Sequence, residues 1–141
     1  MKDFTFNVPQ DIIFGKGSLK RLPELLEKSG SKKMLLISGP VLKKIGMVEK
    51  VEEIVKASGI EVEVFTDVEA NPSVATVDKA TEAYKKAGAT SIVAFGGGSP
   101  MDVAKAVGVL AKYGGVTVLT FRSSAIPCAA NAENTHGTSA A

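Results

Sequence analysis

Apolar residues along the chain fall into short runs separated by segments with helical spacing. The continuous runs at 34–37 and 92–95 are typical of strands that are covered on both faces. An alternating run at 60–64, with glutamates between the apolar residues, predicts a strand with one wet face. A last strand is predicted at 116–121. Apolar residues that recur every three or four positions predict helices at 19–26, 48–55, 74–87 and 103–110, and Ser18 is the expected N-cap of the first.

This alternation of strands and helices predicts βαβ units and an α/β fold, with a doubly wound, mostly parallel sheet and helices on both faces. Before it, apolar alternation at 4–8 and the run at 12–14 predict a small N-terminal β-hairpin. Such sheets bind ligands beyond the carboxyl ends of their strands. Three turns are expected there, at 38–40, 71–73 and 96–102.

Composition narrows the class of protein. With 141 residues, 45% of them apolar and 23% charged, the chain is expected to form one globular domain. It lacks both an apolar run long enough to span a membrane and a signal-peptide core, and its single Cys128 excludes an internal disulfide. A net charge of +2, evenly spread, gives no reason to expect nucleic-acid binding. We therefore expect a cytoplasmic protein.

The last twenty residues differ from the rest. Every lysine lies at or before Lys112, and Glu133 is the only acid beyond it. From Arg122 onward the chain is mostly Ala, Ser, Thr and Asn, which bury too little apolar surface to offset the entropy lost on ordering. The expected organisation is therefore a domain at 1–121 and a poorly ordered tail at 122–141.

The most informative stretch is Gly96–Asp102, with the sequence GGGSPMD directly after a buried strand. Glycines let the backbone approach a ligand, Ser99 suits a helix N-cap, and Pro100 suits the first helical position. Free N–H groups and the helix dipole there favour an anion such as a pyrophosphate. The alternative is a plain turn, with Ser99 and Asp102 forming a capping box. Three consecutive glycines exceed what a plain turn needs, which favours a ligand.

The stretch matches neither the G-x-G-x-x-G fingerprint nor a Walker A loop. Together with the following Ala104–Ala106, it resembles the pyrophosphate loop of the iron-containing alcohol dehydrogenases. Asn71-Pro72 and Phe14–Gly17 match that family's Asn-Pro turn and Phe-Gly-x-Gly segment, and order and spacing agree across 4–112. The resemblance implies a Rossmann-like nucleotide-binding domain. The wider superfamily includes glycerol dehydrogenases and dehydroquinate synthases.

The resemblance also implies site residues. Gly97, Gly98 and Ser99 would wrap the cofactor pyrophosphate, Asp102 would lie towards the nicotinamide, and Asn71 would lie near the adenosine. The full set of expected cofactor-binding residues is Gly39, Asn71, Gly97, Gly98, Ser99, Pro100, Met101 and Asp102.

Position 39 bears on the choice of cofactor. NAD-preferring members of the family often carry an aspartate there, which accepts hydrogen bonds from the ribose hydroxyls, whereas this chain has Gly39. A carboxylate would repel a 2′-phosphate, so its absence favours NADP over NAD, although NAD stays open. Lys43 and Lys44 are candidates for binding the phosphate and equally for solvated helix charges.

The resemblance fails at the metal site. The family holds its metal with one aspartate and three histidines from a following helical domain, whereas this chain has only His136, which we expect to be solvated. Ile126-Pro127 begins a cofactor-contacting segment of the family, but its threonines are missing here. Both a divergent loop and a frameshifted or artificially truncated end fit this pattern. We therefore expect the helical metal-binding domain to be absent, and assign no catalytic residue and no metal ligand.

Three functions remain in view. The leading one is the truncated NAD(P)-binding domain of a metal-dependent alcohol dehydrogenase, inactive by itself. The others are a stand-alone nucleotide-binding module and a folded remnant that binds nothing. Apolar surface left by a missing domain would favour a homo-oligomer.

Overall fold

The computed structural model describes residues 12–111, 116–122 and 134–140. Its strands are β1 Ile12–Phe14, β2 Lys33–Ser38, β3 Glu61–Phe65, β4 Ser91–Gly96, β5 Val116–Arg122 and β6 Asn134–Ala140. Its helices are the 3₁₀ turn η1 Ser18–Arg21, α1 Leu22–Lys28, α2 Pro40–Lys44, α3 Met47–Lys56, α4 Val74–Ala87 and α5 Gly98–Ala111. None of the helices in these ranges is long and apolar enough to cross a bilayer.

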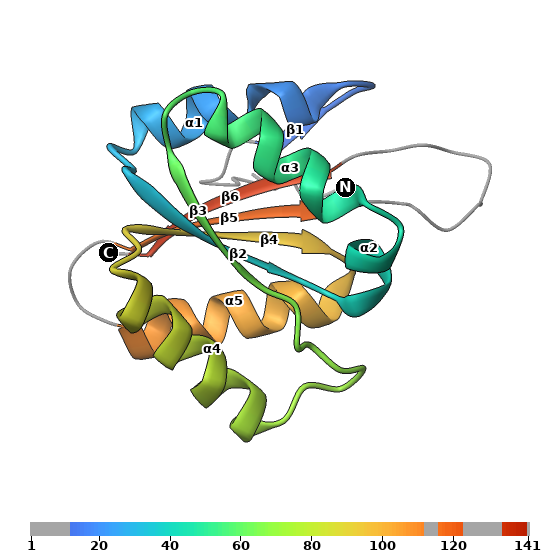
Figure 1. Cartoon of the computed structure of the whole chain (residues 1–141), viewed down its shortest axis with the longest axis vertical. Helices are drawn as coiled ribbons and strands as arrows, with labels where there is room; N and C mark the ends of the chain where they lie inside the picture. Colours follow the sequence, from blue (N-terminus) through green and yellow to red (C-terminus); the bar gives the residue numbers. More distant parts are fainter. Residues whose placement is uncertain (1–11, 112–115, 123–133, 141) are drawn as a thin grey trace, which may run out of the picture.

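The strands form one sheet in the order β1-β6-β5-β4-β2-β3. β3, β2, β4 and β5 are parallel, and β6 runs antiparallel between β5 and β1. Helices α1 and α3 cover one face of the sheet, and α4 and α5 cover the other (Figure 1). The predicted α/β, doubly wound and mostly parallel fold is therefore confirmed.

The burial of β2 on both faces explains why its sequence is apolar at successive positions. Met34 and Leu36 pack with α1 and α3, while Leu35 and Ile37 pack with α4 and α5, and all four side chains are fully buried. Strand β3 has only one strand neighbour in the described sheet, and its glutamates are exposed. The sequence pattern thus distinguished a central strand from a more exposed one.

The N-terminal elements depart from prediction in two ways. Ser18 does not cap a long helix, because a 3₁₀ turn begins at Ser18 after Gly17, whose φ of 80° lies in the left-handed region. The α-helix proper begins at Leu22, with Pro23 in its first turn. The strand at 12–14 is confirmed, and its described partner is β6. The other strand of the predicted hairpin, at 4–8, lies outside the described residues.

β6 lies in the segment 122–141, for which the sequence predicted a poorly ordered tail. It pairs with β5 across seven registered positions, from Val116 opposite Ala140 to Arg122 opposite Asn134. The pairing uses backbone N–H and C=O groups, so small polar side chains do not prevent it. The structure thus places a strand at 134–140, and the division into a domain at 1–121 and a poorly ordered tail at 122–141 stays a prediction.

Candidate functional site

The order of the strands creates a crevice between β2 and β4. After β2 the chain crosses to β3 on one side, and then to β4 on the other side of β2. At such a reversal the connections leave in opposite directions, and the gap beyond the carboxyl ends of the two strands is the usual ligand site of doubly wound sheets. Gly39 follows β2 and Gly97 follows β4, so both turns lie at this gap.

A cleft of about 360 Å³ opens at this place. It is lined by three segments, 39–42, 68–70 and 96–100, which lie at the carboxyl ends of β2, β3 and β4 respectively. Five of the residues predicted from the sequence line it together, namely Gly39, Gly97, Gly98, Ser99 and Pro100. The apolar wall formed by Val41, Leu42 and Val68 was not predicted.

The other three predicted residues do not line the cleft. Asn71 follows the lining residue Ala70 and has a left-handed backbone with φ of 56°. Met101 is partly buried and packs against the core between α5 and the sheet, which gives it a structural role. Asp102 is exposed in the first turns of α5. Their predicted contacts with a cofactor therefore stay predictions.

Helix α5 begins earlier than predicted. Its first residue is Gly98, so Ser99 lies inside the first turn and is not the N-cap, and Pro100 is the third helical residue, not the first. A capping box with Ser99 as the cap is therefore wrong. The proline still fits, because N–H groups of the first turn have no acceptor within a helix. The N–H groups of Gly98 and Ser99, which precede Pro100, belong to the N-terminal end of the helix, and this end lines the cleft.

The three loop glycines have different roles. Gly96 has a φ of 138°, and a Cβ there would lie 3.2 Å from Leu42 Cδ1 and 3.3 Å from Pro100 Cγ, so the fold itself requires this glycine. A Cβ at Gly97 or Gly98 would meet no atom within 4 Å, and neither has a left-handed φ. Packing does not explain glycine at these two positions, whereas close approach of a ligand to the backbone does.

Glu69 is a cleft residue that the sequence reasoning missed. Its Oε1 accepts a hydrogen bond of 2.9 Å from Thr76 Oγ1. Hydrogen bonds from Thr76, and then from the side chain and backbone of Ser73, hold the pKa of the Glu69 carboxyl below its ordinary value. The sequence feature that could have indicated it is the position of this carboxylate, two residues before the Asn71-Pro72 turn.

Ser38 ties together the ends of the two strands that border the cleft. The side chain is fully buried, and its Oγ donates a hydrogen bond of 2.7 Å to the carbonyl oxygen of Phe95. This bond lies one residue before each of Gly39 and Gly96. It therefore fixes the spacing between the two turns.

Replacing Ser38 by alanine is expected to lower the free energy of unfolding by about 1 kcal/mol, the usual net value of a buried hydrogen bond. Urea unfolding followed by circular dichroism measures it. Ser58→Ala is the control, because the Ser58 hydroxyl bonds its own helix end at Val55, away from the cleft. A loss at Ser38 no larger than at Ser58 would contradict the role of this strand-to-strand bond.

The family model described as iron-containing alcohol dehydrogenase matches residues 9–136. The chain belongs to this family. It is 42% identical over 123 residues to choline dehydrogenase from Bacillus subtilis and 43% identical over 108 residues to an NADPH-dependent butanol dehydrogenase from Clostridium saccharobutylicum. These alignments cover 87% and 77% of this chain, but only 30% and 27% of the two relatives.

A solved structure shares the fold. The NADH-dependent butanol dehydrogenase A of Thermotoga maritima superimposes with a TM-score of 0.72 and 35% identity, over 80% of this chain and 29% of that one. The chain therefore spans under a third of the length of these relatives. What it matches is the nucleotide-binding portion of an iron-containing alcohol dehydrogenase.

The described residues do not suit the family's iron. No group of three or more His, Cys, Asp or Glu side chains comes together within 12–111, 116–122 and 134–140. His136 is a residue of β6, in register with Ile12 of β1 and Thr120 of β5. A metal of this family thus finds no ligand set in this part of the chain, and we derive no reaction step through it.

One of the two lysines near Gly39, Lys43, has an acidic partner in the structure. Lys43 Nζ forms an ion pair with Glu49 Oε1 at 2.7 Å, which links α2 to α3. The hydrogen bond to Glu49 raises the pKa of Lys43 above its ordinary value. Lys43 thus already has an anionic partner, which makes it a less available ligand for a phosphate than an unpaired lysine would be.

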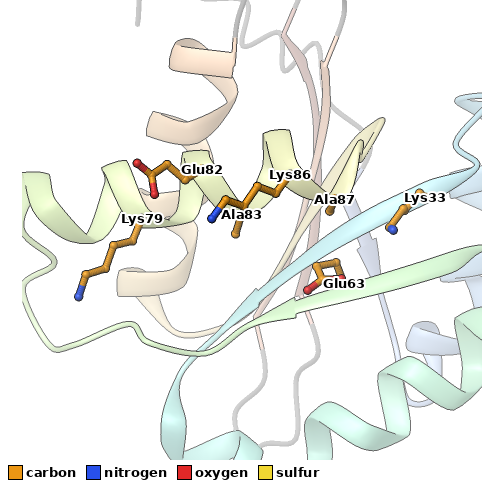
Figure 2. A pocket seen from close by; sticks show the side chains of 7 residues that line it. All are labelled: Lys33, Glu63, Lys79, Glu82, Ala83, Lys86 and Ala87. Atoms are coloured by element: carbon orange, nitrogen blue, oxygen red, sulfur yellow. The ribbon is translucent and has the colours of Figure 1, made fainter.

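A second hollow, of about 410 Å³, lies beside α4 and the strands β2 and β3. Figure 2 shows the charged side chains around it, which come from both strands and from α4: Lys33, Glu63, Lys79, Glu82 and Lys86. Lys33 begins β2 and Lys86 lies near the end of α4, so this hollow lies towards the amino ends of the strands. Ligands of doubly wound sheets bind at the opposite end.

Proposed function

We propose that this chain binds a nicotinamide dinucleotide, NAD or NADP, in the cleft between 39–42, 68–70 and 96–100. It would do so as the cofactor-binding domain of a metal-dependent alcohol dehydrogenase. The observation that carries the proposal is the open space at Gly97 and Gly98, at the N-terminus of a 14-residue helix. Uncovered backbone and a positive helix end together suit a pyrophosphate.

The chain's own residues would bind and orient the cofactor. The N–H groups that begin α5 would donate to the pyrophosphate. The adenosine half would lie over the ends of β2 and β3, between Gly39 and the segment 68–70, with the exposed Val41 offering apolar surface. Asp102 would lie on the nicotinamide side. When bound, the nicotinamide ring gives or takes the hydride.

For the choice between NAD and NADP we propose a preference for NADP. The support is Gly39, which brings no carboxylate to meet a 2′-phosphate. The pairing of Lys43 with Glu49 makes one candidate cation less available, so the preference is expected to be small. The relatives differ in this respect, since their names include both an NADPH-dependent and an NADH-dependent butanol dehydrogenase.

Catalysis by this chain alone is not expected. We have identified neither a general base for an alcohol nor a metal ligand set in the described ranges. Oxidation of an alcohol, with a metal to polarise its oxygen, is therefore proposed only for a protein of the relatives' full length. A cytoplasmic location and a homo-oligomer are further proposals that rest on the sequence.

Calorimetric titration of the purified chain with NADP and then with NAD, without added metal, tests the proposal. We expect the chain to bind both dinucleotides, with NADP bound more tightly by a factor of a few. The factor is small because the only difference we can name is the absent carboxylate at Gly39, which would have repelled the 2′-phosphate. Circular dichroism verifies that the protein is folded. A folded protein that binds neither dinucleotide at millimolar concentration would contradict the proposed function and leave the non-binding remnant as the explanation.

A further inference from the structure

Three polar side chains form a cluster on the wall of the cleft that follows β3. Thr76 Oγ1 donates to Glu69 Oε1 at 2.9 Å and lies 3.1 Å from Ser73 Oγ. Ser73 Oγ in turn accepts the backbone N–H of Thr76 at 3.3 Å, as the N-cap of α4. Glu69 lines the cleft, whereas Thr76 is only 6% exposed. The cluster therefore joins a cleft residue to a buried position on a helix.

This cluster bridges a turn whose backbone is strained. Asn71 lies between Glu69 and Ser73 with a φ of 56°, the one left-handed residue other than glycine in the described chain. This conformation is uncommon outside glycine, although asparagine tolerates it better than other residues, and contacts on both sides of the turn help to hold it. Val68, just before the turn, is 4% exposed and packs in the core beneath α4 and α5. The turn is thus anchored by Val68 on one side and by the bridge to Thr76 on the other.

The bridge is strongest when the carboxyl group is ionised. A hydrogen bond to a charged acceptor is stronger than one between neutral groups. The hydrogen bonds from Thr76 and Ser73 lower the pKa of Glu69, so the carboxylate stays charged at neutral pH. Its position beside the first turn of α4 also suits a negative charge.

We propose that Glu69 is a positioning residue for the dinucleotide site, and that it acts through Thr76 to hold the turn at 70–72 against the adenosine half. The proposal rests on the proposed function. It assigns Glu69 no contact with the cofactor itself. What Glu69 supplies is an acceptor oxygen at a fixed place, which keeps Ala70 and Asn71 in the binding conformation.

Two pairs of variants separate this role from a direct effect of the charge. Glu69→Ala removes both the acceptor and the charge, whereas Glu69→Gln removes the charge but keeps an acceptor oxygen. Thr76→Val removes the hydroxyl, whereas Thr76→Ser keeps it. Glu63→Ala is the matched control, because Glu63 is exposed on β3 and lines the second hollow, not the cleft. NAD and NADP affinities are measured by calorimetry, with thermal unfolding in parallel.

Positioning predicts that Glu69→Ala and Thr76→Val each weaken both cofactors about tenfold, as expected for loss of a hydrogen bond to a charged group. Combining the two should cost no more than either alone. Thr76→Ser and Glu63→Ala should stay within about twofold of the parent chain. Glu69→Gln keeps a weaker, neutral acceptor, so its affinities should lie between those of the parent chain and of Glu69→Ala. The rescue by serine and the partial rescue by glutamine keep the test valid if Thr76→Val unfolds.

Other outcomes overturn the inference in distinguishable ways. Tighter NADP binding by Glu69→Gln, with NAD unchanged, would make Glu69 a direct sensor of the 2′-phosphate. Unchanged affinities in Glu69→Ala, with a parent chain that binds, would overturn the positioning role and leave the proposed function standing. A folded parent chain that binds neither cofactor would overturn both.

Discussion

Gly98→Ala is expected to weaken binding of both NAD and NADP by about tenfold or more. The added methyl group would lie in the open space of the cleft, where a pyrophosphate must come close to the backbone. Forcing an extra methyl group into a close contact costs about 1–3 kcal/mol, which exceeds the 1.4 kcal/mol of a tenfold change over most of that range.

The same substitution should not damage the domain. A Cβ at Gly98 meets no atom within 4 Å, its φ is not left-handed, and alanine favours a helix more than glycine does. The expected result is thus weaker binding at equal or higher thermal stability, measured by calorimetry and thermal unfolding. Val109→Ala, at a 72% exposed position near the other end of α5, is the control for binding. If Gly98→Ala binds as tightly as the parent chain, the loop is a plain strand-to-helix turn.

The elements that the sequence predicted well are those whose burial can be inferred from their own residues. The continuous apolar runs of β2 and β4 reflect burial on both faces, and the alternation at 60–64 reflects the exposed glutamates of β3. The glycine turn was found because strand, glycines and helix follow one another directly. For such features local pattern and tertiary position coincide.

Other features depend on contacts between distant segments. β6 is held by backbone pairing with β5 and β1, which its Ser- and Thr-rich sequence does not reveal. The helix start predicted at Ser18 was misplaced, because a 3₁₀ turn begins there and α1 begins only at Leu22. The start predicted at Ser99 was misplaced in the other direction, because α5 begins at Gly98. Glu69 lines the cleft because, in the folded chain, the segment after β3 lies beside the turns after β2 and β4. Alternation of residue types contains none of this information.

Leu36→Ala is expected to lower the free energy of unfolding by about 2–5 kcal/mol, the range for a large buried side chain cut to alanine. Leu36 is fully buried in β2, between Val64 of β3 and Val93 of β4 in the register of the sheet. It belongs to the cluster under α1 and α3, with Leu22 among its members. Since small domains are stable by only about 5–15 kcal/mol, this loss would leave the protein marginal.

A matched control makes the cause clear. Leu110→Ala is the same chemical change at a 51% exposed position of α5, and should cost about 1 kcal/mol or less. Both variants are compared by urea unfolding at low temperature. The dinucleotide affinity of folded Leu36→Ala should match that of the parent chain, because Leu36 does not line the cleft. A cost at Leu36 no greater than at Leu110 would mean that the face of the sheet under α1 and α3 is not the core that stabilises the domain. Lost affinity in a folded Leu36→Ala protein would instead mean that the turn after β2 shifts with the packing beneath it.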